Sequence, residues 1–120
     1  MILIVDDNEQ LARALSTALK KRGYKGVTAS NGGEAYAHLK SGSCQCMLLD
    51  ICMPDINGIE LLLLMQSEGI KTPTIVMTGF SDFEEEELSQ FDSVVAFRSK
   101  PFLLADMMAL VSEHTHVCDP

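Results

Sequence analysis

The sequence has few basic residues and no long apolar run. Nine lysines and arginines stand against 17 aspartates and glutamates, which gives a formal net charge of -8. Unaided nucleic-acid binding is therefore not expected, because it needs a basic face to meet phosphates. Docking on a basic protein surface stays open. No apolar run is long enough to cross a membrane, and MILIV (1–5) is too short for a signal-peptide core.

The pattern of the cysteines does not resemble the disulfide framework of a secreted protein. The four cysteines are Cys44, Cys46, Cys52 and Cys118. We therefore expect a reducing, cytoplasmic location. Cys44 and Cys46 are two residues apart on a predicted strand, so they should share one face. His114, His116 and Cys118 leave a metal-binding tail as an alternative, but no second ligand cluster has metal-site spacing.

Apolar runs alternate with segments of helical periodicity along the whole chain. The 120 residues suit one domain, without linkers or repeats. Nearly all-apolar strands, each followed by a helix, predict a doubly wound α/β fold whose parallel sheet is covered on both faces. The expected strands are 2–5, 26–29, 44–49, 74–77 and 94–97, and the expected helices are 11–19, 35–39, 59–65, 83–88 and 103–111.

Polar residues follow four of the five predicted strands at the point where each strand ends. In an open α/β sheet, ligands bind outside the carboxyl ends of the strands, so these residues should meet at one edge. Asp50 ends the apolar run MLL (47–49), where burial of an unpaired charge would be costly. The residues expected at this edge are Asp6, Asp7, Asp50, Thr78 and Lys100.

Repulsion between the carboxylates determines the chemistry of this edge. Three carboxylates lie close together only if a cation neutralises them or one stays protonated. Oxygen ligands that leave room for water suit Mg²⁺. The lysine would supply a fixed positive charge and Thr78 a hydroxyl donor. A carboxylate nucleophile, Mg²⁺, an ammonium and a hydroxyl together favour phosphoryl transfer.

Each of these features also has an ordinary structural explanation when taken alone. Asp7 or Asn8 is a natural helix cap after the first strand. Lys100-Pro101 after the last strand is a common turn. Their occurrence together at separate strand ends favours one shared site.

The motifs at these strand ends resemble the receiver domain of response regulators, the phospho-accepting module of two-component signalling. The resemblance is chemotaxis-regulator-like and covers essentially the whole chain. It implies a flavodoxin-like fold with strand order 2-1-3-4-5, and a signalling switch rather than a metabolic enzyme. The motifs are VDDN (5–8), LLDICMPDINGIELL (48–62), VMTGF (76–80) and SKPF (99–102).

The resemblance assigns a role to each residue of the site. Asp50 would accept the phosphoryl group from a histidine kinase or phosphotransfer protein, in a reaction that the domain itself catalyses, as it does the later hydrolysis. Asp7, Asp50 and the backbone carbonyl of Cys52 would bind Mg²⁺ directly, and Asp6 would bind it through water. Lys100 would contact the acyl phosphate.

Other positions would tune or transmit the reaction. Thr78 would move to bond a phosphate oxygen, and Phe97 stands where the family has its switch aromatic. Cys52 and Phe80 would tune how water reaches the acyl phosphate, and the small Gly79 would leave room for the phosphoryl group. The resemblance also implies a cis Lys100–Pro101 bond, which only proline makes accessible, and a loop behind Asp50 that Pro54 and Gly58 shape.

The face made by the fourth helix, fifth strand and fifth helix is where receivers signal, and we expect a homodimer contact or an output domain there. On the last helix, Leu104, Met107 and Val111 fit an inward stripe. Two readings stay open for its other apolar residues: partial exposure, or one wide core stripe. Those residues are Leu103, Met108 and Leu110.

Three rival functions are less well supported. A phosphohydrolase would carry a second acid close after Asp50, but Asp55 is five residues away. A flavodoxin-type nucleotide site would not have two aspartates after the first strand. A receiver that has lost its chemistry would not keep the full set of site residues. We expect a receiver at 1–114 and a tail at 115–120, compatible with a stand-alone protein or a piece of a longer one.

Overall fold

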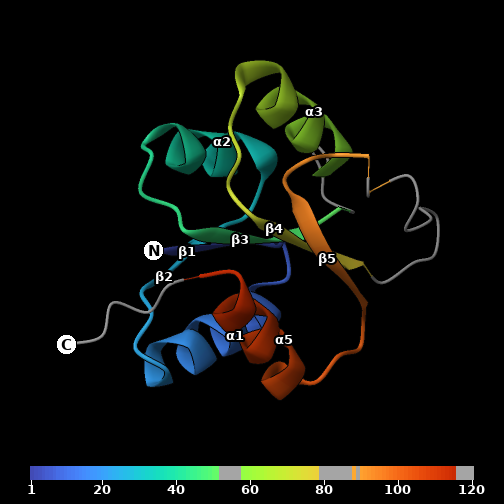
Figure 1. Ribbon diagram of the computed structural model, residues 1–120. Helices are drawn as coiled ribbons and strands as arrows, with labels where there is room; N and C mark the ends of the chain where they lie inside the picture. Colours follow the sequence, from blue (N-terminus) through green and yellow to red (C-terminus); the bar gives the residue numbers. More distant parts are fainter. Residues whose placement is uncertain (52–57, 79–87, 89, 116–120) are drawn as a thin grey trace.

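The computed structural model describes residues 1–51, 58–78, 88 and 90–115 (Figure 1). Strands and helices alternate in it as the sequence predicts. The strands are β1 (Ile2–Val5), β2 (Gly26–Ala29), β3 (Cys46–Asp50), β4 (Thr74–Thr78) and β5 (Val94–Ser99). The helices are α1 (Glu9–Lys21), α2 (Gly32–Lys40), α3 (Gly58–Glu68) and α5 (Leu104–Glu113). The expected helix at 83–88 lies outside the described residues except for Leu88.

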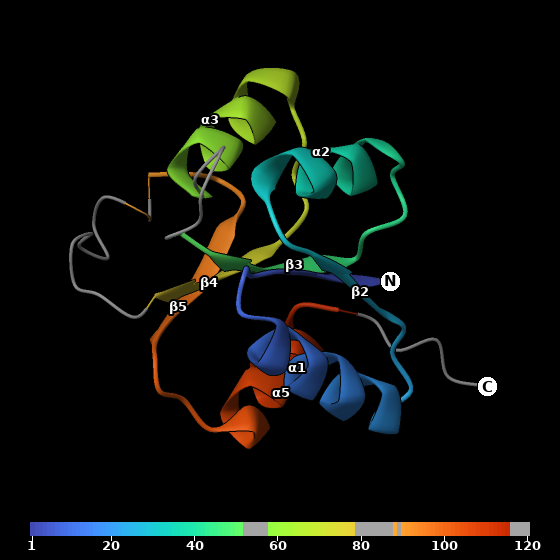
Figure 2. The ribbon, with the colours of Figure 1, turned by 180° about the vertical axis from the view of Figure 1, so that it is seen from behind.

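The five strands form one parallel sheet in the order β2-β1-β3-β4-β5. The predicted doubly wound sheet and its order 2-1-3-4-5 are therefore confirmed. Helices α2 and α3 cover one face, and α1 and α5 cover the other (Figures 1 and 2). No helix in the described part of the chain is both long and apolar enough to span a membrane.

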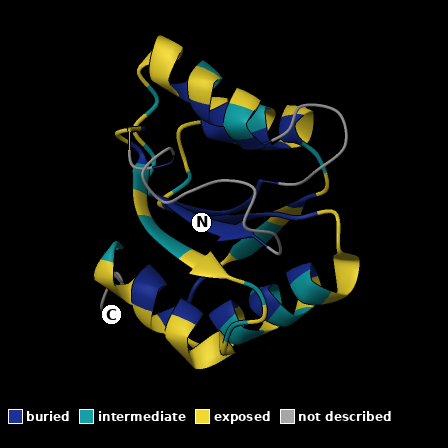
Figure 3. Cartoon of the chain, turned by 90° about the vertical axis from the view of Figure 1, so that its right-hand side faces the viewer, coloured by how far each residue is buried: buried dark blue, intermediate teal, exposed yellow. Residues whose placement is uncertain are grey.

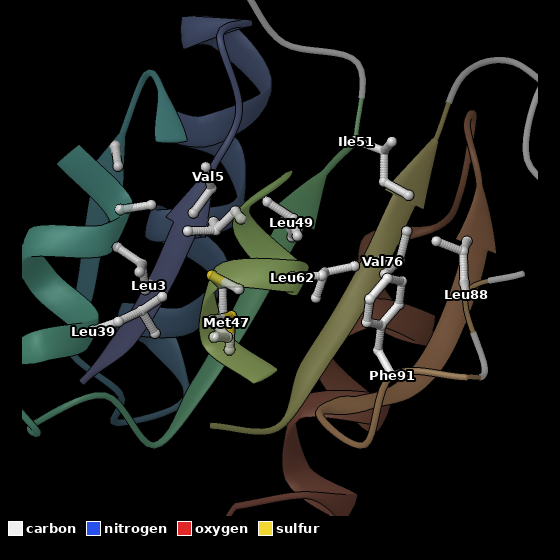
Figure 4. Close-up of a cluster of buried hydrophobic side chains, with 14 residues drawn as sticks. Leu3, Val5, Leu39, Met47, Leu49, Ile51, Leu62, Val76, Leu88 and Phe91 are labelled. Carbon is white, nitrogen blue, oxygen red and sulfur yellow. The ribbon is translucent and has the colours of Figure 1, made fainter. Parts of the chain in front are cut away.

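The sheet separates two apolar clusters, because successive strand residues point to opposite faces. Leu3 and Val5 face α2 and α3, whereas Ile2 and Ile4 face α1 and α5. Figure 4 shows the first cluster, in which strand side chains meet helix side chains such as Leu62. Both clusters are closed to solvent, and the outer faces of the helices are exposed (Figure 3). Full burial of each large apolar side chain contributes about 1.5–3 kcal/mol to the stability of the fold. The buried sheet therefore holds the residues at its strand ends in place.

Helix α1 begins at Glu9, and its N-cap Asn8 comes directly after the acidic pair that follows β1. The side-chain oxygen of Asn8 accepts the backbone N–H of Gln10 at 3.1 Å and of Leu11 at 3.2 Å. These bonds satisfy donors that have no partner inside the helix. Of the two cap candidates, Asn8 is therefore the residue used, and Asp7 keeps its carboxylate for other contacts.

The prediction that Cys44 and Cys46 share one face is wrong. Strand β3 begins at Cys46, so Cys44 precedes the alternation of the strand. Cys44 packs against the cluster under α2 and α3, whereas Cys46 lies in the cluster under α1 and α5. Burial raises the pKa of the Cys46 thiol to about 12, so this thiol is a core group and stays protonated.

The two readings of α5 are resolved for most of its residues. Met108 and Leu110 are buried, so the expectation of partial exposure is wrong for them and the wide core stripe holds. Helix α5 lies beside α1 under the sheet (Figure 2), so α5 packs against both the sheet and α1 and buries a wider stripe of residues. Leu104, expected inside, is 39% exposed, and Leu103 is 69% exposed.

Gly58, the first residue of α3, approaches the backbone that follows Asp50. A β-carbon at this position would lie 2.6 Å from Ile51 Cα, and the Gly58 N–H donates to Ile51 O at 3.0 Å. We expect Gly58→Ala to displace this segment and to cost about 1–3 kcal/mol in the free energy of unfolding. Denaturant titration measures it. Gly33→Ala in α2 is the control: a β-carbon there would lie 3.3 Å from Asn31 Oδ1 and close to no backbone atom, so this substitution should cost much less.

Candidate functional site

The predicted site residues converge at the carboxyl edge of the sheet. Asp6 and Asp7 follow β1, and Asp50 is the last residue of β3. These three side chains each offer a carboxylate oxygen, and the oxygens all lie within 4.8 Å of one another. Asp6 and Asp50 are buried, whereas Asp7 is exposed. The cluster therefore has a buried floor and one side open to solvent.

Lys100 holds this cluster together in the structure. Its Nζ donates to Asp6 Oδ2 at 2.9 Å and to Asp50 Oδ2 at 3.3 Å. Partial burial alone would lower the pKa of Lys100, but hydrogen bonds and charge from Asp6 and Asp50 outweigh burial, and the net pKa is raised. The ammonium is therefore a permanent positive charge at physiological pH.

Backbone contacts fix the position of Lys100 at the end of β5. The Lys100 N–H donates to Thr78 O at 2.6 Å, which continues the pairing of β4 with β5 beyond the strand ends. The Lys100–Pro101 peptide bond is cis. Thr78 itself is buried at the end of β4. The lysine and the threonine hydroxyl are thus carried by two hydrogen-bonded strands.

Asn8 has a second role that sequence reasoning missed. Its backbone N–H donates to Asp6 Oδ1 at 2.9 Å, while Asp6 Oδ2 accepts from Lys100. Both oxygens of the Asp6 carboxylate are therefore bound and its orientation is fixed. The sequence indicates that Asn8 can cap the helix, but it does not reveal that the backbone N–H of Asn8 points toward Asp6.

The donor set of the cluster suits a hard divalent cation. Three carboxylates face one ammonium, so the cluster retains negative charge, and all its ligand atoms are oxygens. Mg²⁺ prefers such oxygens and keeps several waters, for which the open side at Asp7 leaves access. Cys52, whose carbonyl was expected to be a further ligand, lies outside the described residues, as do Pro54, Gly79 and Phe80.

Phe97 lies on β5 and is half-buried. Its ring packs against the edge of the cluster under α2 and α3. On the neighbouring strand, Thr78 pairs with Ser99, two residues after Phe97. The two residues expected to switch are therefore on adjacent strands, but only Thr78 stands at the acidic cluster.

Comparison with known proteins identifies the family in which this arrangement of residues occurs. The family profile of the response regulator receiver domain matches residues 2–112. Regulatory protein AtoC of Escherichia coli is 35% identical in an alignment of 114 residues that covers 92% of this chain and 24% of AtoC. The DNA-binding transcriptional regulator NtrC of Salmonella typhimurium is 31% identical over 111 residues, 92% of this chain and 24% of NtrC. The chain spans about a quarter to a half of the curated relatives it matches.

Solved structures agree with this assignment. A response regulator receiver protein from Pseudomonas putida superposes with a TM-score of 0.84 at 32% identity, covering 93% of this chain and 94% of that one. Response regulator protein TrrA from Thermotoga maritima, solved in complex with Mg²⁺ and BeF, gives a TM-score of 0.81 at 29% identity, covering 93% and 96%. The chain belongs to the response regulator receiver domain family.

Proposed function

We propose that Asp50 accepts a phosphoryl group from a phosphohistidine of a histidine kinase or a phosphotransfer protein, as the receiver of a two-component response regulator. The observation that carries the proposal is the pair of bonds from Lys100 to Asp6 and Asp50. A cation and a carboxylate nucleophile meet at the ligand-binding edge of the fold. The role is that of a signalling switch.

The step needs one bond made and one broken. A carboxylate oxygen of Asp50 attacks phosphorus, and the bond between phosphorus and the donor imidazole nitrogen breaks. The nitrogen keeps the electron pair and takes a proton from solvent. The Lys100 ammonium, within 3.3 Å of Asp50 Oδ2, stabilises negative charge on the phosphoryl oxygens. Asp6, fixed by two bonds, holds Lys100 in place.

Asp6, Asp7 and Asp50 would hold Mg²⁺, together with the Cys52 carbonyl. When bound, the ion supplies positive charge that offsets the repulsion between a carboxylate nucleophile and a phosphoryl group. The chain provides the acidic ligands on rigid strand ends and leaves Asp7 open to solvent. The self-catalysed loss of the phosphoryl group would use the same residues with water as the acceptor.

Phosphorylation would act on the rest of the chain through Thr78 and Phe97. New charge on Asp50 would attract the Thr78 hydroxyl, and Phe97 would pack further inward beside the moved strand end. Phe97 has no hydroxyl, so its part is packing alone. The fourth helix, β5 and α5 would present the changed face to a second copy or to an output domain. Neither direct nucleic-acid binding nor membrane binding belongs to this proposal.

Phe80 provides a test of how the lifetime of the acyl phosphate is set. We expect Phe80→Asn to speed hydrolysis at least severalfold, because a large apolar side chain keeps water from the phosphoryl group and a small polar one admits it. The decay of the phosphorylated mass after removal of the donor measures the rate. Phe83→Asn, an aromatic replacement outside the family motifs, is the control. Equal decay in Phe80→Asn and the wild type would contradict the shielding role.

The function is tested by intact mass after incubation with acetyl phosphate. We expect one added phosphoryl group with Mg²⁺ and none with a chelator. If no adduct forms with acetyl phosphate or with any phosphohistidine donor, while Mg²⁺ still binds, the chain is a receiver without phosphoryl chemistry.

A further inference from the structure

The basic residues of this acidic chain are concentrated around α1. Five of the nine lie between residues 13 and 25, and none of the 17 acids lies between residues 10 and 33. Four of the five form a compact group that we call the basic turn: Lys20, Lys21, Arg22 and Lys25. All four are exposed, and within the described part of the chain ion pairs involve only Lys40 and Lys100 among the lysines and arginines.

The basic turn lies at the opposite edge of the sheet from the acidic cluster. Helix α1 starts beside the carboxyl end of β1 and runs back to the start of β2 (Figures 1 and 2). Its 13 residues correspond to about 20 Å of helix. A partner on the basic turn would therefore leave Asp50 open to its phosphodonor.

Beside the basic turn is a hollow between α1 and the start of β2. It has a volume of about 450 Å³ and is lined by Ser16, Lys20, Tyr24, Lys25 and Gly26. The Tyr24 ring is buried, and its hydroxyl is 2.9 Å from that of Thr115, just after α5. Gly26 lets β2 pass close to α1, since a β-carbon there would lie 2.9 Å from Ser16 Oγ. Two lysines thus flank a hollow held by α1, β2 and the end of α5.

The surroundings of the basic turn select the kind of partner. A membrane surface or a long duplex would also meet the acids that dominate the rest of the surface. Membrane binding further needs several apolar side chains to insert. Among the exposed large apolar residues of the described chain, which are Leu63, Val95, Leu103 and Leu104, only Leu104 lines a hollow with a residue of the basic turn, Lys21. A short acidic peptide reaches the four cations and the hollow without those repulsions.

We propose that the basic turn is a docking site for an acidic segment of a partner protein. Carboxylates of the segment would pair with Lys20 and Lys25 across the hollow and with Lys21 and Arg22 on its rim. The proposal is independent of the phosphoryl chemistry at Asp50. A segment bound in the hollow would contact Tyr24, and the hydrogen bond between Tyr24 and Thr115 would then restrain the end of α5.

Binding of a fluorescein-labelled, glutamate-rich peptide to the full chain tests the proposal. We expect saturable binding at low salt. The backbone amide signals that shift should be those of the basic turn, of its sequence neighbours as far as Gly26, and of Thr115. Lys20→Glu/Lys25→Glu should weaken binding about tenfold, and raised salt should weaken it in the wild type, because exposed pairs are screened. Lys71→Glu/Arg98→Glu changes the net charge equally but lies elsewhere, and should bind nearly as the wild type does.

Three outcomes would overturn the proposal. One is equal weakening in both charge-reversed variants, which would mean that only net charge matters. Another is the absence of binding by the wild type at low salt, or amide shifts that map away from the hollow. The third is tighter binding to phosphatidylglycerol vesicles or duplex DNA than to the peptide. Thermal unfolding of both variants establishes that they are folded.

Discussion

The Asp50→Asn variant is expected to take up no phosphoryl group and, without a divalent cation, to unfold at a higher temperature than the wild type. The amide lacks the nucleophilic carboxylate. It also removes one negative charge from a cluster in which three carboxylates lie together and Asp50 is only 5% exposed. The Lys100 bond to Asp6 remains. We expect a net gain of about 1 kcal/mol, or about 4 °C in Tm, measured by calorimetry in chelator.

Mg²⁺ should reverse the order of the two proteins. The ion binds the wild-type cluster and stabilises it by mass action, whereas the variant has lost one ligand and should respond less. Asp92→Asn, which removes an exposed acid far from the site, should show neither effect. A variant that is less stable than the wild type in chelator would contradict the account of repulsion between the carboxylates.

Removal of the Lys100 ammonium is expected to cost both stability and activity. Lys100→Ala leaves the buried carboxylates of Asp6 and Asp50 without their cation. Loss of one partner of a buried ion pair is costly, but the Lys100 side chain is 23% exposed and screening reduces the effect. We expect a loss of about 2 kcal/mol in chelator and at least a tenfold slower phosphorylation. Denaturant titration and the time course of the mass shift measure these.

Lys40→Ala is the matched control for this variant. Lys40 also bonds a carboxylate at 3.3 Å, that of Glu68, but the two side chains are 54% and 30% exposed. Surface pairs contribute little, so stability should hardly change and phosphorylation should not. Equal destabilisation by the two substitutions would show that burial of the carboxylates does not determine the role of Lys100.

The pH dependence of the Lys100→Ala effect follows from the sign of the pKa shift. Folding raises the pKa of Lys100, so the folded state holds this proton more tightly than the unfolded state does. The stability contributed by Lys100 is then fully present below the unfolded pKa of about 10.4 and is lost as the pH rises through the folded pKa. The stability gap between wild type and variant should be constant from neutral to mildly alkaline pH and shrink only above that range.

Much of the fold was predictable from the sequence, since buried parallel strands and amphipathic helices have different periods. β1 and β2 match the predicted ranges, and the strand order is as expected. The convergence of Asp6, Asp50 and Lys100 was also predictable, because strand ends of a parallel sheet share one edge. The carboxylates do lie together there.

The remainder depends on packing that a single sequence does not reveal. The face of Cys44 required knowing that β3 starts at Cys46, because a residue that precedes a strand does not follow the alternation of faces within it. Exposure on α5 depended on α1 lying beside it. Two further contacts involve backbone atoms, and the residue types alone do not predict them. They are the hydrogen bond from the Asn8 amide to Asp6 and the close approach of Gly58 to Ile51.

The central claim is that the phosphoryl group is carried by Asp50 rather than by its acidic neighbours. Borohydride reduces an aspartyl phosphate to homoserine, which marks the modified position permanently. After incubation with acetyl phosphate and Mg²⁺, reduction and peptide sequencing by mass spectrometry should place homoserine at position 50 alone. Homoserine at position 6 or 7, or a phosphorylated mass that yields no homoserine, would contradict the account.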